Sequence, residues 1–160
     1  MVSLWRVSHF GIPLAAESKA ADWFHPAGPL LTCEASAIAA LYAQLVAVEQ
    51  PNPRAMALTE RIFELQIPDQ LVIESGITWR MARNSLPVRQ IVGKWIETRS
   101  SLAMRVPSLS GAYQYIVNLR HPLATSLAIE DRGAYPYTVY LPQVECALTD
   151  PDAWLCVRGS

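Results

Sequence analysis

Two stretches of the chain have the spacing of apolar residues that is typical of an amphipathic helix. In residues 36–49 the apolar positions recur at intervals of three and four residues, which places them on one helical face: Ile38, Leu41, Tyr42, Leu45 and Val46. Ser36 suits the capping position before the first turn, and Pro51 prevents continuation. Residues 87–99 repeat the same spacing, and Pro87 suits a first helical position. The pattern therefore predicts two main helices.

Alternation of apolar and polar residues, with many β-branched and aromatic side chains, predicts short strands elsewhere. One opens the chain at residues 2–8. In another, Phe63, Leu65 and Ile67 alternate with Ile62, Glu64 and Gln66. The remaining predicted strands are at 71–73, 103–106, 113–119, 126–130 and 137–141. Residues 11–31 are interrupted by prolines and glycines, so we expect an irregular segment with a short strand at its end.

Many short strands beside only two long helices indicate an α+β fold with a small mixed or antiparallel β core. The chain has 160 residues, which fits one domain of roughly 100–200 residues. No linker or internal repeat divides it. We therefore expect residues 1–160 to form a single domain.

Composition narrows the classes of partner. Hydrophobic residues make up 51% of the chain and charged residues only 17%, which suggests an apolar surface that a partner or a second copy would cover. The net charge of −1 argues against direct binding to nucleic acid or to an acidic membrane. Neither a signal peptide nor an apolar run of ~18 residues is recognisable, so a cytoplasmic location is expected.

Motifs with a known chemistry are missing from the sequence. There is no glycine-rich phosphate loop, no G-x-S-x-G and no H-E-x-x-H. Cys33, Cys146 and Cys156 have no zinc-motif spacing, so we expect buried thiols and no metal site. Glu60 and Glu64 are expected to be strand-edge or exposed charges. General sequence rules alone predict an α+β domain and no particular function.

Several segments nevertheless resemble a known family. Residues 102–122, LAMRVPSLSGAYQYIVNLRHP, resemble a family segment that reads roughly L-x-R-V-P-S, then N-x-L-x-N-x-x-H-P. The preceding helix resembles the family's helix with a glycine and a tryptophan through Gly93 and Trp95, and residues 4–6 resemble its opening aromatic-Arg strand. The stretch ADWFHPAGPLLTCEAS is similar to its G-R-W-[NH]-x-x-G-x-P-x-x-Y-x-A-x-S motif. On these motifs, which span most of residues 4–122, the chain resembles RES-domain proteins.

The resemblance implies both a fold and an activity. RES domains are typically the toxin component of bacterial toxin–antitoxin pairs, with an Xre-type helix-turn-helix antitoxin as partner. Their fold is similar to that of ADP-ribosyltransferases. They destroy NAD⁺ by hydrolysis or phosphorolysis, or transfer ADP-ribose to a protein. Such a site must hold the pyrophosphate, stack on the nicotinamide and place a carboxylate near the cationic ribose of the transition state.

The resemblance also assigns roles to individual residues. Arg6 matches the family's first site arginine and would bind a phosphate, although a strand arginine paired with a local acid is an alternative. Ser108 matches the serine of V-P-S and would bind a ribose or position a nucleophile; an ordinary turn serine is the alternative. Trp23 matches the tryptophan of G-R-W, where core packing is the more ordinary role. Thr32 takes the position of the tyrosine that stacks on the substrate.

Departures from the family pattern affect the same site. Asp22 stands where the arginine of G-R-W belongs, and Thr32 cannot stack as a tyrosine does. Ala43 stands seven positions past Ser36, where the family has an acidic residue. Glu49 would lie about 9 Å further along the helix and on another face, and Glu34 precedes the helix.

Three functions remain open on these grounds. One is a toxin-like protein with a degenerate NAD-binding site that acts by binding, either to a nucleotide or to the antitoxin of an active toxin. Another is an active NAD⁺-degrading enzyme or ADP-ribosyltransferase with a divergent residue set such as Arg6, Ser108, His25 and Glu34. The third is a non-catalytic assembly protein, for instance a homodimer. NAD⁺ is expected as a substrate or ligand, and no other cofactor is required.

Overall fold

The structure, a computed structural model, describes residues 1–9, 30–47, 60–82, 85–108 and 113–134. Contacts within the chain group it into two compact units, each assembled from separate segments of the sequence. The α3 unit contains residues 1–2, 14–33 and 66–128, and the α1 unit contains residues 3–13, 34–65 and 129–160. Each unit has its own sheet. The α+β class predicted from the sequence is confirmed, and the single domain stays a prediction.

The α3 unit contains a four-stranded sheet of mixed direction. Its strand order is β2 (Leu30–Cys33), β6 (Tyr113–Asn118), β5 (Ala103–Pro107) and β4 (Val72–Glu74). The β2–β6 and β6–β5 pairs are antiparallel, whereas β4 and β5 are parallel. A parallel pair needs a crossover connection, and here it is made by two helices, α2 (Trp79–Ala82) and α3 (Ser85–Thr98).

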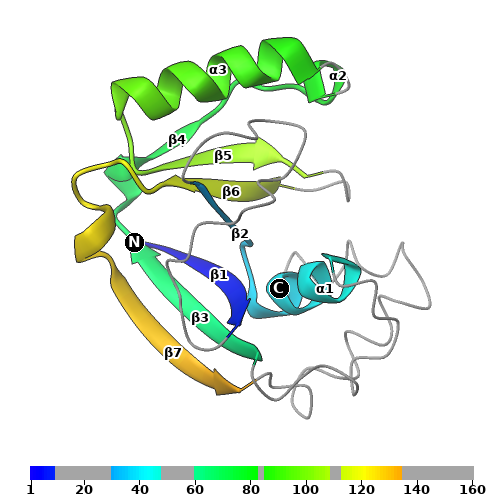
Figure 1. Cartoon of the computed structure of the whole chain (residues 1–160), viewed down its shortest axis with the longest axis vertical. Coiled ribbons are helices and arrows are strands. Elements are labelled where there is room, and N and C mark those ends of the chain that lie inside the picture. Colours follow the sequence, from blue (N-terminus) through cyan, green and yellow to red (C-terminus); the bar gives the residue numbers. More distant parts are fainter. Residues whose placement is uncertain (10–29, 48–59, 83–84, 109–112, 135–160) are drawn as a thin grey trace. The chain divides into compact units, whose positions relative to one another are not determined.

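Helix α3 covers one face of this sheet (Figure 1). The buried side chains of the helix contact those of the strands in one hydrophobic cluster. From α3 come Val88, Val92, Trp95 and Ile96, and from the strands Leu30, Met104, Val106 and Ile116. The predicted helix at 87–99 is thus confirmed, but it begins two residues earlier. Pro87 is tolerated there because first-turn N–H groups have no partner within the helix.

A buried hydrogen-bond network ties the end of α3 to the sheet. Trp95 Nε1 donates to Ser101 Oγ at 2.8 Å. Asn118 is completely buried; its Nδ2 donates to the carbonyl of Ile96 at 3.2 Å and its Oδ1 accepts from the N–H of Arg120 at 2.9 Å. One side chain thereby connects the helix, the end of β6 and the following turn. Trp95 and Asn118 also carry much of the family resemblance, and in this structure both are packing residues.

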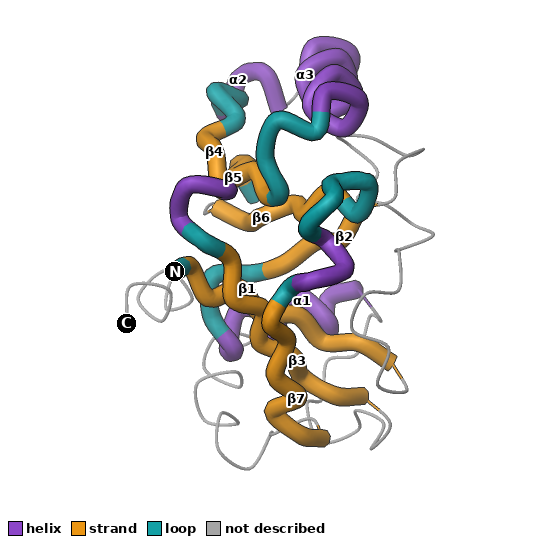
Figure 2. The backbone as a smooth tube through the Cα atoms, turned by 90° about the vertical axis from the view of Figure 1, so that its left-hand side faces the viewer, coloured by secondary structure: helices purple, strands orange, loops and turns teal. Residues whose placement is uncertain are grey.

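The α1 unit contains a three-stranded sheet and one helix. The strand order is β1 (Val2–His9), β3 (Glu60–Ile67) and β7 (Ala128–Ala134), which run side by side in Figure 2. Helix α1 (Ala37–Ala47) packs through Ala37, Ala40 and Leu41 on Val7, Ile62 and Trp5. The predicted cap is present, since Ser36 Oγ accepts a hydrogen bond from the N–H of Ala39 at 3.2 Å.

Most predicted strands are confirmed, with shifted ends. β7 begins at Ala128 instead of Ser126, because Ala124–Ser126 form a turn of 3₁₀ helix. A second such turn, Asp69–Leu71, takes Leu71 from the strand predicted at 71–73, which is β4. The short helix α2 was not predicted, since four residues are too few to show a period. The strand expected at 137–141 lies outside the described residues.

We expect Asn118→Ala to destabilise the protein by about 2 kcal/mol, because the Ile96 carbonyl and the Arg120 N–H would each lose a buried partner. Urea titration followed by circular dichroism measures this. Gln90→Ala, on the exposed side of α3, is the matched control and should change stability by less than about 0.5 kcal/mol. Equal effects of the two substitutions would contradict the role given to Asn118.

Candidate functional site

The predicted site residues fall in both units. Arg6 lies in β1 of the α1 unit and is 6% exposed. Thr32 lies in β2 and Ser108 directly follows β5, both in the α3 unit. Trp23 is outside the described residues, as are Asp22 and His25. Of the predicted residues, then, the structure brings Thr32 and Ser108 into one unit and describes Arg6 in the other.

Thr32 and Ser108 lie on the same face of the sheet as a third polar residue, Gln114, which was not predicted to belong to a site. Thr32 is opposite Ile116, whose side chain packs under α3, and Gln114 is two residues away on the same face of β6. Val106 is opposite Gln114, and Ser108 is two residues further on. Diagonal neighbours of this kind lie roughly 7–8 Å apart. Thr32, Gln114 and Ser108, which we call the polar diagonal, thus follow one another across the sheet.

Burial separates the polar diagonal from ordinary surface residues. Gln114 is 8% exposed and Ser108 is 5% exposed, whereas Thr32 is half-buried. The neighbouring residues on this face are apolar and belong to the cluster under α3. An alternating strand pattern does predict that Gln114 shares the face of Ile116. Gln114 was nevertheless not predicted as a site residue.

The other face of the same sheet carries a partly exposed charged group. Arg105 Nε is 2.8 Å from Glu74 Oε1, and its guanidinium carbon is 4.3 Å from the centre of the Tyr113 ring. Burial alone would lower the pKa of Arg105, but the hydrogen bond and the charge of Glu74 outweigh it, so the pKa is raised. Arg105 is therefore a cation at every physiological pH, and Glu74 already neutralises it.

In the α1 unit, Arg6 faces away from helix α1. Its neighbours Trp5 and Val7 both pack against α1, and successive strand residues point to opposite faces. Leu4 and Ser8, which share the face of Arg6, are also buried. Arg6 is therefore a buried residue and not an exposed surface arginine.

The carboxylates of β3 are buried, which corrects the expectation that they are exposed or at a strand edge. Glu60 is 7% exposed and Glu64 is 6% exposed. They alternate with Ile62 on the side of the strand that α1 covers, and Gln44 Nε2 of α1 lies 3.5 Å from Glu60 Oε2. β3 is the central strand of its sheet, so alternation by itself does not separate a solvent face from a covered one.

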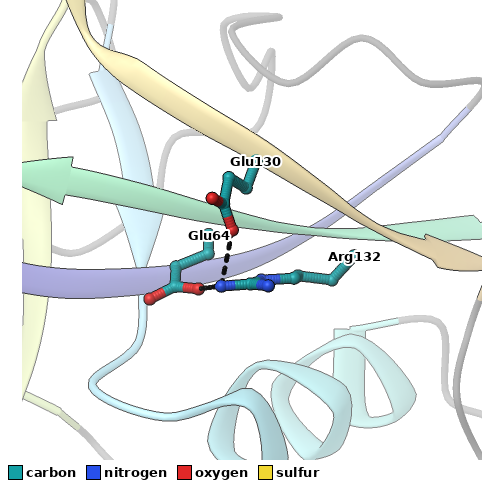
Figure 3. Close-up of polar contacts among 3 residues, drawn as sticks. All are labelled: Glu64, Glu130 and Arg132. Carbon is teal, nitrogen blue, oxygen red and sulfur yellow. Dashed lines mark hydrogen bonds and ion pairs between the residues drawn. The ribbon is translucent and has the colours of Figure 1, made fainter.

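Arg132 neutralises the buried carboxylate of Glu64. Its guanidinium forms an ion pair with Glu64 and a second one with Glu130 at 2.5 Å, as Figure 3 shows. The guanidinium carbon is also 5.9 Å from the centre of the Trp5 ring. The hydrogen bond to Glu64 is the largest cause of the raised pKa of Arg132. A buried charge needs such a partner, because desolvation alone would be costly.

None of these carboxylates shares the face of Arg6. Glu64 contacts Arg132, which lies over Trp5, and Trp5 is on the α1 side. Glu34 pairs with Trp5 in an antiparallel bridge, with hydrogen bonds of 2.7 and 2.8 Å, so its side chain is on that side as well. By strand alternation, Arg6 therefore starts from the opposite face of the sheet to these two carboxylates.

Helix α1 supplies no carboxylate either. Its residues 37–47 include no aspartate or glutamate, and Ala43 occupies the position at which the family pattern has an acid. In the part of the chain that the structure describes, no three or more His, Cys, Asp or Glu residues are grouped as metal ligands would be. Cys33 is a buried free thiol, and the other two cysteines lie outside the described residues. Within that same part, no helix has the length and apolar content needed to cross a membrane.

Comparison with known proteins gives no family model that matches the sequence and no matching curated protein.

We expect Arg132→Met to lower the melting temperature, because Glu64 would lose the partner of its buried charge. The double variant Arg132→Met/Glu64→Gln should recover most of the loss, since a neutral amide is less costly to bury. The melting temperatures of the unsubstituted protein, Arg132→Met, Glu64→Gln and the double variant form a double-mutant cycle. Additive losses in the double variant would contradict the pairing.

The carboxyl group of Asp131 makes the stability of the folded protein depend on pH. The hydrogen bond from Arg61 Nε, at 2.8 Å, and a second one from the N–H of Gly133 lower the pKa of Asp131. A lowered pKa in the folded state stabilises the protein above the unfolded-state pKa, and this stabilisation is lost as the pH falls below about 4. Both partners are partly exposed, so the effect should be at most about 1 kcal/mol.

We expect Asp131→Asn to flatten the stability profile of the protein in that acidic range and to leave its slope near pH 7 unchanged. Urea titrations at a series of pH values measure both. A profile that stays parallel to that of the unsubstituted protein below pH 4 would contradict the assignment.

Proposed function

We propose that this chain is a RES-like, toxin-type protein with an ADP-ribosyltransferase-like fold that binds NAD⁺ or a related nucleotide and does not cleave it efficiently. The proposal combines the sequence resemblance with two features of the α1 unit: a buried arginine in β1 and a helix α1 without an acidic residue.

The order of the elements supports the fold assignment. The strand with Arg6 opens the chain, β2 leads directly into α1, and α3 leads into β5 and β6. The matching motifs occur in this order: aromatic-Arg, then A-x-S, then G-x-W, then R-V-P-S and H-P. Two small sheets with one main helix each give an α+β architecture suited to such a family.

Arg6 supports binding of an anionic ligand. A guanidinium binds phosphate with two parallel hydrogen bonds, and it stays charged when it is buried. Arg6 is 6% exposed in a strand whose face includes Leu4 and Ser8.

One observation carries the loss of efficient cleavage: helix α1 offers no negative charge, since its residues 37–47 include no aspartate or glutamate and Ala43 stands where the family pattern has an acid. Departure of nicotinamide leaves a cationic ribose, which needs such a charge close by. Loss of one positioned group costs about 10²–10⁴ in rate. Ala43 and Thr32 remove two groups together. The protein then acts by binding, either to the nucleotide or to the helix-turn-helix antitoxin of an active toxin.

The test is a pair of measurements on the purified chain. We expect NAD⁺ to bind in titration calorimetry, and nicotinamide release, with and without phosphate, to stay far below about 1 s⁻¹. Arg6→Gln should weaken binding by at least about tenfold, which is the loss of one charge-assisted hydrogen bond. Arg89→Gln, an exposed arginine on α3, is the control. Melting temperatures show whether the Arg6 variant is folded.

The outcomes separate the three functions. Release at the rate of an ordinary enzyme, reduced in Arg6→Gln, would favour the active enzyme with a divergent residue set. No binding of NAD⁺, together with a stable oligomer, would favour the assembly protein. Binding without release supports the proposal.

A further inference from the structure

We propose that α2 and the outer side of α3 form a docking surface for an acidic helical segment of a partner protein. This surface, which we call the α2–α3 surface, consists of Trp79, Arg80, Leu86 and Lys94. It lies within the α3 unit and includes none of the residues assigned to nucleotide binding.

Two large apolar side chains of the α2–α3 surface are exposed. Trp79 is 42% exposed in α2, and Leu86 is 63% exposed in the first turn of α3. The two helices contact each other and are consecutive along the chain (Figure 1). Neither side chain belongs to the hydrophobic cluster that packs the inner face of α3 on the sheet. Large apolar side chains exposed on adjoining helices are typical of a surface that another protein covers.

The charge of this part of the chain has one sign. Residues 75–96 contain four basic residues and no acidic one, although the chain has 14 acidic residues in all. Arg80 and Lys94 are both exposed. A partner that covers them must supply negative charge, because two groups of like sign in contact repel each other.

The arginines of the strands differ from these two cations. Arg61, Arg105 and Arg132 are each paired with an aspartate or a glutamate. Within the described residues, no carboxylate forms an ion pair with Arg80 or Lys94. Both cations are therefore available to the carboxylates of a partner.

The spacing along α3 fits a helix of the partner. Leu86, Gln90 and Lys94 are four residues apart, so they follow one another along one side of the helix over about 12 Å. The row begins with an apolar contact and ends with a cation. A partner helix that packs along it would place an apolar residue against Leu86 and a carboxylate about two turns away, against Lys94.

A protein segment suits this surface better than a membrane or a nucleic acid. An amphipathic helix binds a membrane through a wide apolar face, and the apolar face of α3 is already packed on the sheet. Binding to nucleic acid depends on an excess of positive charge, whereas the net charge of the chain is −1. Tryptophan and arginine, in contrast, are the residues that most often dominate the binding energy of protein–protein interfaces.

The experiment measures binding of the full chain to a fluorescent synthetic helix of about 18 residues, made of glutamate, leucine and alanine with the glutamates and leucines on one face. Fluorescence anisotropy should show saturable binding that weakens as salt is added, because exposed ion pairs are screened. One control helix has serine in place of leucine, and another has lysine in place of glutamate. Each should bind at least about tenfold more weakly.

Variants of the chain locate the contact. Trp79→Ala should weaken binding of the glutamate–leucine helix at least about tenfold, whereas Leu123→Ala, which shortens another exposed side chain of the α3 unit, should not. The double variant Arg80→Gln/Lys94→Gln should weaken binding about fivefold and reduce its salt dependence. Arg120→Gln, at an exposed arginine of the same unit, is its matched control. All these side chains are exposed, so the melting temperature should not change.

Three results would overturn the inference. The first is no binding of the glutamate–leucine helix, or binding that Trp79→Ala leaves unchanged. The second is tighter binding, through the same residues, of phosphatidylglycerol vesicles or of single-stranded DNA, because the occupant would then be a membrane or a nucleic acid. The third is self-association of the chain that Trp79→Ala abolishes, since a second copy would then occupy the surface. None of these results bears on the binding of NAD⁺.

Discussion

The buried carboxamide of Asn118 is the interaction on which the order of the α3 unit depends. It holds the last turn of α3 through Ile96 and the turn after β6 through Arg120. A helix packed on a sheet by apolar contacts alone has several similar positions available, because such contacts are non-directional. Hydrogen bonds that must be satisfied in the interior remove that freedom. The pairing of β6 with β2 and β5 places Gln114 between Thr32 and Ser108.

The α1 unit buries charged side chains, whereas the buried polar group of the α3 unit described above is a neutral amide. The sheet of the α1 unit buries two glutamates of β3 on the side of α1, and Arg132 neutralises one of them through an ion pair that also includes Glu130. Such pairing lowers the cost of desolvation and seldom adds much net stability. Because Arg132 uses its guanidinium there, Glu64 has little remaining capacity to stabilise a developing positive charge. Glu64 and Glu130 therefore have a structural role in this unit.

The resemblance motifs divide into residues that build the scaffold and residues that do chemistry. Trp95 and Asn118 are buried and hydrogen-bonded within the α3 unit. Selection for folding alone preserves such residues. Ala43 and Thr32, by contrast, stand where the pattern has an acid and a stacking ring.

Much of the fold was predictable because the period of the apolar residues reports local structure. The helices at 37–47 and 85–98 and most strands follow from it, and so does the cap at Ser36. The period of the apolar residues does not predict burial on β3, because both faces of this central strand are covered. Nor does the period indicate which charged residue pairs with a residue far away in the sequence. Glu64 meets Arg132 across 68 residues, and Gln114 is brought between Thr32 and Ser108 by strand pairing. Local propensity acts over a few residues, whereas these contacts arise from the pairing of distant segments.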